Sequence, residues 1–217
     1  MENGARAGFG ARVPDNFIGG GLAESKSVTY DDVTLTRTDK ELTANDYTFS
    51  GHLLTIKTAG KYTLSGTASN EDFRVKVVGE SGQRIKTTLT IDNLTIDTNN
   101  GGYKDGYSPL DFSGAGETTL ILVGENQLTA RGNNPAVYAP NVKSGNKNEN
   151  AIQLTICGEG SLVANGGQDW PGIGNTGSAR ILIQSGNITA VGGGNAAGIG
   201  GSYGFWFDSI AITGGRV

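Results

Sequence analysis

The sequence contains few of the residues on which catalytic sites most often depend. It has one histidine, His52, and one cysteine, Cys157, among 217 residues. His52 stands at the head of a strand-like segment with no serine or cysteine placed to use it as a base, which argues against nucleophilic catalysis. A single cysteine also excludes an internal disulfide. We therefore predict that the protein is not an enzyme.

The sequence also lacks the patterns typical of membrane and nucleic-acid partners. No apolar stretch approaches the roughly 18 residues that a membrane-spanning helix needs. Lysine and arginine are scattered without a basic run, and the net charge is −4, so nucleic acid is an unsuitable partner. The first residues form no hydrophobic segment of the kind that begins a secretory signal. We expect neither membrane insertion nor binding to nucleic acid.

Helical patterns are absent, and short strand-like strings stand in their place. No window of about 12 residues combines helix-forming residues with the apolar spacing of a helix. The chain has five prolines but 36 glycines, and strings such as Leu54-Thr-Ile56 and Leu89-Thr-Ile91 recur along it. Such alternation of apolar and β-branched residues is typical of strands. The sequence therefore predicts an all-β chain.

One unit is written twice near the C-terminus and is begun a third time. The copies start at Gln153, Arg180 and Ser209, and each opens with a short apolar string. Matching positions carry isoleucine in every copy, namely Ile156, Ile183 and Ile212 in one string and Ile173 and Ile199 in a later one. A period near 28 residues, built from short strands and glycine turns, is typical of a β-solenoid.

We predict a single-stranded, three-faced parallel β-solenoid of five to six coils. The usual preference of parallel crossovers makes it a right-handed β-helix. Residues 1–25 form a glycine-rich arm or leader, residues 26–50 form an N-terminal β cap, and residues 51–217 form the coils, the last of which is incomplete. The open coil ends are a possible surface for self-association.

Inward residues of successive coils are expected to stack in columns. On the first face we predict two columns, Leu54, Leu89, Leu120, Leu154, Ile181 and Ile210 in one and Ile56, Ile91, Leu122, Ile156, Ile183 and Ile212 in the other. On the second face we predict Leu64, Ile96, Leu128, Leu162, Ile188 and Val217. On the third we predict Val75, Leu110, Val137, Ile173 and Ile199.

Acidic residues gather in the longest predicted coil. Asp92, Asp97, Asp105 and Asp111 fall within 20 residues of one another. Because Ca²⁺ prefers hard oxygen ligands from loops, these residues are candidate calcium ligands. The alternative is a solvated loop with aspartates in its turns. Glu125 and Glu159 occupy equivalent positions in adjacent coils, so we expect them close together on one face as turn residues.

Aromatic residues fall in the loops inserted between the predicted strands. Tyr103, Tyr107, Trp170 and Trp206 are candidate carbohydrate-binding residues, because flat rings on a rigid β surface can stack on sugars. The alternative is that loop aromatics fill the core. We expect this for Phe205 and Phe207, near the C-terminal end of the chain.

Two stretches resemble known repeat families. Ala196-Ala-Gly-Ile-Gly-Gly201, preceded by residues 188–194, is similar to glycine-rich repeats of large bacterial cell-surface proteins. Residues 54–66, followed by residues 89–96, resemble carbohydrate-binding β-helix domains of secreted proteins from Gram-positive anaerobes. The resemblance covers roughly residues 27–217. It implies a right-handed, pectate-lyase-like parallel β-helix with polysaccharide as partner, bound Ca²⁺ and no established catalysis.

These observations predict a non-catalytic module that binds polysaccharide, with Ca²⁺ as its candidate cofactor. A surface rich in Thr, Asn and Gly favours an extracellular or cell-surface location. One alternative is a structural subunit of a fibre or stalk in which copies stack head to tail. A weaker alternative is a polyuronate lyase.

Overall fold

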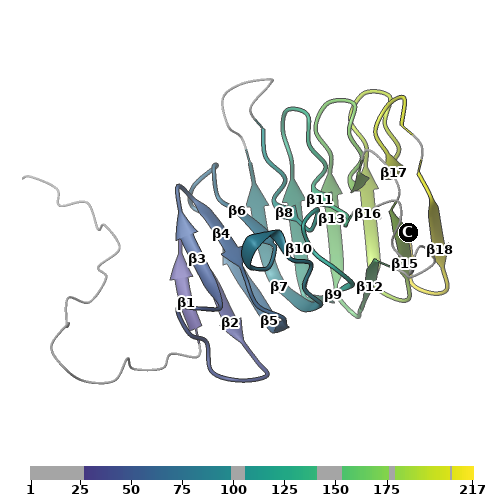
Figure 1. Cartoon of the computed structure of the whole chain (residues 1–217). Coiled ribbons are helices and arrows are strands. Elements are labelled where there is room, and N and C mark those ends of the chain that lie inside the picture. The colour runs from purple at the N-terminus through teal and green to yellow at the C-terminus, as the bar shows by residue number, and fades with distance from the viewer. Residues whose placement is uncertain (1–26, 99–105, 141–152, 176–178, 206) are drawn as a thin grey trace, which may run out of the picture.

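The computed structural model describes residues 27–98, 106–140, 153–175, 179–205 and 207–217 (Figure 1). In this part of the chain the regular elements are strands, apart from one short 3₁₀ helix, η1 (Glu80–Gly82). The all-β prediction is therefore confirmed. Among the described residues no helix has the length and apolar character that crossing a membrane requires. In Figure 1 the strands follow one another side by side, from purple near the N-terminus to yellow at the C-terminus.

The strands form two sheets. The larger sheet has 11 strands, and its long branch has the order β1-β2-β5-β7-β9-β12-β15-β18. These are β1 (Ser27–Tyr30), β2 (Val33–Arg37), β5 (Gly60–Thr67), β7 (Thr87–Asp97), β9 (Thr118–Val123), β12 (Leu154–Gly158), β15 (Arg180–Ile183) and β18 (Ser209–Ile212). A short branch contains β10 (Glu125–Thr129), β13 (Ser161–Asn165) and β16 (Asn187–Val191).

Strand β7 belongs to both branches because it bends along its length. Residues Thr87–Asp92 pair with β9, whereas residues Thr95–Asp97 pair with β10. At the bend, Asn93 has a φ of 49°, and Gly124 and Gly158 take the left-handed region at the corresponding bends of the next two turns. A Cβ at Gly158 would lie 2.2 Å from the carbonyl oxygen of Leu122, so only glycine fits there.

The smaller sheet has seven strands in the order β17-β14-β11-β8-β6-β4-β3. They are β17 (Ile199–Gly201), β14 (Ile173–Asn175), β11 (Val137–Tyr138), β8 (Leu110–Asp111), β6 (Arg74–Val77), β4 (Leu53–Ile56) and β3 (Tyr47–Ser50). All pairs are parallel except β3 with β4. The register aligns one buried or half-buried residue from each of five strands, and this column matches the prediction: Val75, Leu110, Val137, Ile173 and Ile199.

The first predicted column on the larger sheet is wrong at its N-terminal end. Leu54 lies in the smaller sheet, where it pairs with Val75. Ile56 of the other first-face column also lies there, paired with Val77. On the larger sheet Tyr62 of β5 stands beside Leu89 in the place predicted for Leu54, and Leu64 stands beside Ile91 in the place predicted for Ile56. The two strings Leu54-Thr-Ile56 and Tyr62-Thr-Leu64 have the same apolar pattern, so alternation alone cannot assign them to sheets.

A second error is a shift of two residues between β9 and β12. Leu120 pairs with Ile156, and Leu154 pairs with Thr118. A shift by two keeps every inward side chain inward, so the pattern of the sequence does not detect it. Further along, Ile156, Ile183 and Ile212 pair in one column, as predicted.

The second-face column is wrong at Leu64, which pairs with Ile91 on the long branch and not with Ile96, and it shows an offset further along. Ile96 pairs with Leu128, and Leu162 pairs with Ile188, as predicted. Leu128, however, pairs with Ala164 rather than with Leu162. Here too the inward face is right and the position along the strand is wrong.

The stretch predicted as an N-terminal cap contains the antiparallel strands. β1 pairs antiparallel with β2, β2 with β5, and β3 with β4. The ring of Tyr30 on β1 stacks on that of Phe49 on β3, with centroids 4.1 Å apart. This contact joins the N-terminal edges of the two sheets over the core.

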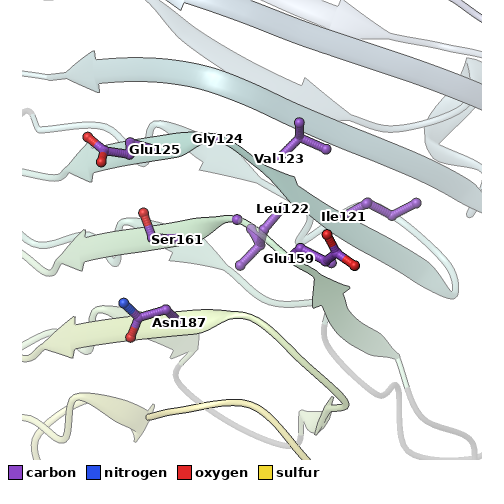
Figure 2. Close-up of a pocket in the computed structure, with 10 residues that line it drawn as sticks. Ile121, Leu122, Val123, Gly124, Glu125, Glu159, Ser161 and Asn187 are labelled. Carbon is purple, nitrogen blue, oxygen red and sulfur yellow. The ribbon is translucent and has the colours of Figure 1, made fainter.

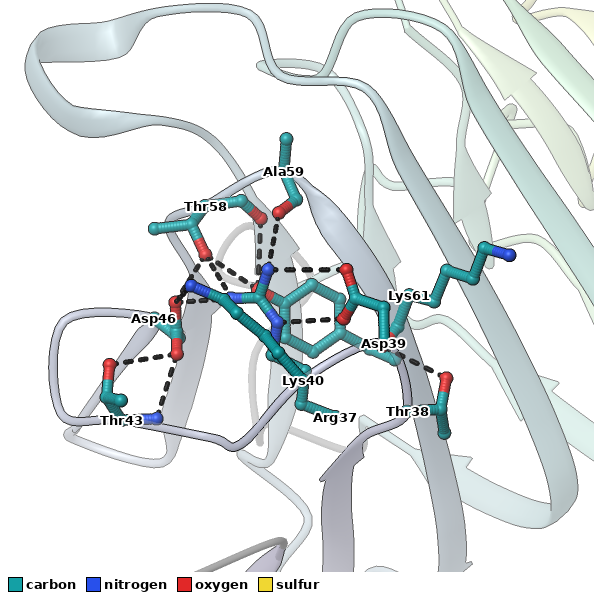
Figure 3. Close-up of polar contacts among 10 residues, drawn as sticks. Arg37, Thr38, Asp39, Lys40, Thr43, Asp46, Thr58, Ala59 and Lys61 are labelled. Carbon is teal, nitrogen blue, oxygen red and sulfur yellow. Dashed lines mark hydrogen bonds and ion pairs between the residues drawn. The ribbon is translucent and has the colours of Figure 1, made fainter. Parts of the chain in front are cut away.

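A buried polar network, the Arg37 network, fixes the loops beside these strands (Figure 3). The Arg37 guanidinium pairs with Asp46 and donates hydrogen bonds to Asp39 at 2.9 Å and to the Ala59 carbonyl at 2.8 Å. Burial by itself raises the pKa of Asp46, but hydrogen bonds from Thr58 and Thr43 and the charge of Arg37 bring that pKa down to about 2.

Candidate functional site

The outward face of the smaller sheet carries a row of long polar and aromatic side chains. The register places Lys76 of β6 beside Asp111 of β8, and Asp111 beside Tyr138 of β11. The row continues as Gly174 and Gly200, which have no side chains. Both glycines are buried, so Tyr138 is the last side chain of this row.

A pocket of about 260 Å³ opens among these strands. Its lining combines aromatic, cationic, acidic and amide side chains: Leu53, Arg74, Val75, Lys76, Tyr107, Ser108, Asp111, Asn134 and Tyr138. Of these residues, Val75 is buried as part of the core beneath. The pocket thus has an apolar floor and a polar and aromatic rim, which is the usual composition of a site for small ligands.

Aromatic rings flank the pocket at three successive levels of the sheet. Tyr107 precedes β8 and lies under the guanidinium of Arg74, 3.8 Å from its central carbon. Tyr138 lies on β11, and its ring centroid is 5.9 Å from that of Trp170, which precedes β14. Tyr107, Tyr138 and Trp170 are all partly exposed. We call this surface the aromatic face.

The polar groups of the pocket are held in different ways. Lys76 Nζ lies 3.0 Å from Asp111 Oδ2, and Asp111 also accepts a hydrogen bond from the Ser113 backbone N–H at 2.8 Å. The Asn134 amide donates to the Gly106 carbonyl. These contacts fix the Asp111 carboxylate and the Asn134 amide at the rim of the pocket.

Ser108 is the exception among these polar groups. It is 6% exposed, and its Oγ has no hydrogen-bond partner among the described residues. A buried hydroxyl without a partner costs about 1–3 kcal/mol. Ser108 lines the pocket, but its Oγ is shielded from solvent, so a hydroxyl of a bound molecule becomes its partner only when the atoms that cover it move aside.

The structure brings together two of the four predicted carbohydrate-binding residues. Tyr107 and Trp170 lie on the aromatic face, whereas Tyr103 and Trp206 lie outside the described residues. Sequence reasoning missed Tyr138. The signal was available, because Val137 was predicted to face inward and its neighbour on a strand faces outward.

The two phenylalanines expected in the core differ. Phe207 is partly buried and packs against the core, as predicted. Phe205 is 57% exposed, so its inward placement is wrong.

The described aspartates proposed as calcium ligands lie apart, each with its own partner. Asp92, at the bend of β7, accepts a hydrogen bond from the Asn93 amide, and Asp97 lies 3.6 Å from Arg131. Asp111 is in the smaller sheet, and Asp105 lies outside the described residues. Within the described ranges, His, Cys, Asp and Glu form no group of three or more suited to a metal ion. The calcium site stays a prediction.

A second hollow of about 680 Å³ lies over the bends of the larger sheet (Figure 2). Val123, Glu125 and Glu159 contribute to its lining. Glu125 is in register with Ser161, and Figure 2 shows the Glu125 and Glu159 side chains pointing to different sides. The expected juxtaposition of the two glutamates is therefore wrong. The described residues that line this hollow include no aromatic side chain, so they provide no surface for stacking.

Comparison with known proteins gives no match. No family model, no curated protein and no solved structure is significantly similar to the chain. A function can therefore be inferred only from the residues that the structure brings together, and the aromatic face is the richest such group.

Proposed function

We propose that the protein is a non-catalytic polysaccharide-binding module and that the aromatic face is its binding site. The observation that carries the proposal is the row of Tyr107, Tyr138 and Trp170 beside a pocket with an unpartnered hydroxyl, Ser108. We also propose an extracellular or cell-surface location, where the protein would meet polysaccharides.

The proposed scaffold is a right-handed, three-faced β-solenoid. The chain visits the long branch, the short branch and the smaller sheet in turn, as β9, β10 and β11 and again as β12, β13 and β14. Each such round would be one coil, and the crossovers between parallel strands favour the right hand. A stack of coils is a rigid support, so aromatic rings on successive levels keep a fixed spacing.

That spacing suits an extended sugar chain lying across the strands. Neighbouring strands are about 4.8 Å apart, so three levels of aromatic residues extend over about 10 Å, close to the length of two sugar rings. The apolar faces of sugar rings can stack on Tyr138 and Trp170. Ring hydroxyls can bond to Ser108, Asn134 and the pair of Lys76 with Asp111, which line the pocket.

Binding of soluble neutral and acidic polysaccharides tests the proposal. We expect the Tyr138→Ala, Trp170→Ala double variant to bind at least roughly 30-fold more weakly, since truncating an aromatic hot spot costs about 2 kcal/mol or more. Val163→Ala is the matched control, because Val163 is a partly exposed apolar residue on the short branch. Failure of the unaltered protein to bind any glycan would overturn the proposal.

Two further assays complete the test. The first measures polysaccharide binding after a chelator has removed Ca²⁺. If the aromatic face is the binding site, binding should be unchanged. Loss of binding would instead favour a role for the predicted calcium ligands Asp92, Asp97, Asp105 and Asp111. Incubation with polygalacturonate should yield no unsaturated product, and its appearance by ultraviolet absorbance would make the protein a lyase.

A further inference from the structure

The two edges of the larger sheet are matched in direction and length. β1 is antiparallel to β2, and β2 is antiparallel to β5, so β1 runs in the same direction as β5. From β5 to β18 every pair along the long branch is parallel. The edge strands β1 and β18 therefore run the same way, and each has four residues. The β18 edge of one copy and the β1 edge of another can pair as a parallel ladder.

The side chains on these edges are also matched. Ile210 and Ile212 continue the column of Ile181 and Ile183, yet they are 39% and 55% exposed. On β1, Val28 pairs with Leu35 and Tyr30 with Val33, so both partly buried residues lie on the core side. Each edge thus carries apolar residues at positions i and i+2 on the core side, and a parallel pairing brings the two sets together.

The edges of the smaller sheet extend the same surfaces. At one end of the molecule Tyr47 and Phe49 of β3 are half-buried, and Phe49 stacks on Tyr30. At the other end Ile199 of β17 is half-buried. β3 would run antiparallel to β17 of another copy, as it already does to β4. Both parallel and antiparallel ladders form hydrogen bonds, so both sheets can continue across the contact.

Charge is complementary at the corner of this contact. Asp32 is exposed in the turn after β1, and its carbonyl lies against the bend residue Gly66. Arg216 is exposed just after the equivalent bend at Gly215. Alignment of β1 with β18 brings the acidic turn of one copy to the same corner as Arg216 of the other.

We propose that a second copy of this chain docks head to tail, with its β1 and β3 edges on the β18 and β17 edges of the first. The contact covers the exposed apolar edge of β18 and pairs the backbone groups on the side of β18 that adjoins no other described strand. Because the two surfaces differ, the contact does not close on itself, and repetition builds a linear assembly.

Sedimentation across a concentration series tests the proposal with three variants of the full chain. The tail variant is Ile210→Lys, Ile212→Lys, at positions already exposed, and the head variant is Val28→Lys. The control is Val163→Lys, on an outward position away from both edges. A second head variant, Asp32→Asn, changes only an exposed charge. It tests the same surface if the Val28→Lys variant does not fold. Circular dichroism confirms folding.

We expect the average mass of the unaltered protein and of the control to rise with concentration. The tail variant and the Val28 variant should each be monomeric, and Asp32→Asn should weaken association severalfold. Mixing the tail variant with the Val28 variant should give a dimer and nothing larger, because one keeps an intact head and the other an intact tail. A monomeric unaltered protein at every concentration overturns the proposal. Self-association of either edge variant alone also overturns it, since this requires a different surface.

Discussion

Two clusters of polar side chains differ in how completely their hydrogen-bonding groups are paired within the protein. In the Arg37 network, Arg37 and Asp46 are 4% and 1% exposed, and Thr43, Thr58 and neighbouring backbone groups complete their hydrogen bonds. In the pocket of the aromatic face, the ion pair of Lys76 with Asp111 is partly exposed, and Ser108 Oγ has no hydrogen-bond partner in the part of the chain that the structure describes. From this difference we infer that the first cluster stabilises the fold, whereas the second is the one that we propose binds a ligand.

The largest effect on stability is expected from breaking the Arg37 network. Asp46→Ala should lower the free energy of unfolding by up to about 3–5 kcal/mol, because it removes the buried partner of the Arg37 charge and leaves only the partly exposed Asp39 beside it. Urea denaturation measures this. Asp111→Ala, in the pocket, is the matched change and should cost no more than about 1 kcal/mol. Equal losses for the two variants would abolish the distinction between the clusters.

The network should also give the fold a specific dependence on acid. The pKa of Asp46 is about 2 in the folded state, below its ordinary value of 3.8. The carboxylate therefore contributes stability above pH 4 that is lost as pH falls toward 2, and the loss is about 2–3 kcal/mol. Urea denaturation at several pH values measures it. In the Asp46→Asn variant this part of the pH dependence should disappear, and an unchanged profile would contradict the assignment.

At Ser108 a substitution is expected to leave the free energy of unfolding unchanged or to raise it. Ser108→Ala removes a buried hydroxyl without a partner, so it should leave stability unchanged or raise it by about 1 kcal/mol. The same change should weaken polysaccharide binding severalfold. Thr58→Ala, in the Arg37 network, should instead destabilise the fold and leave binding unchanged. Loss of stability in Ser108→Ala would show that its hydroxyl already has a structural partner.

The smallest effect is expected at Lys76. Its ion pair with Asp111 is partly exposed, so Lys76→Met should change the free energy of unfolding by less than about 1 kcal/mol. Binding should fall, because the ammonium group lies at the pocket rim. Thermal unfolding and glycan titration of the same preparation separate the two effects. Unaltered affinity would remove Lys76 from the site.

The sequence was sufficient to predict the all-β class, the parallel pairing and several inward columns, because these depend on local alternation and on a repeat. It was insufficient where two arrangements bury the same residues. Leu54 and Leu64 stand in strings of the same pattern, and Leu120 has Leu154 or Ile156 as a partner without any change of face. Only packing between neighbouring strands and between the two sheets decides such cases.

The candidate site was predictable only in part for a different reason. Tyr107 and Trp170 stand out as loop aromatics, but Tyr138 lies in a strand and becomes a surface residue only through its outward orientation. The Arg37 network was not foreseen. Its members are separated by up to 22 residues, and no local motif joins Arg37, Asp46 and Thr58.

The most direct test of the account is hydroxyl-radical footprinting of the protein with and without a bound polysaccharide. We predict protection of Tyr107, Tyr138 and Trp170, with no change at Val163 on the short branch or at Val123 beside the second hollow. Protection of Val123 or Val163, with the three aromatic residues unchanged, would contradict the assignment of the aromatic face as the binding site.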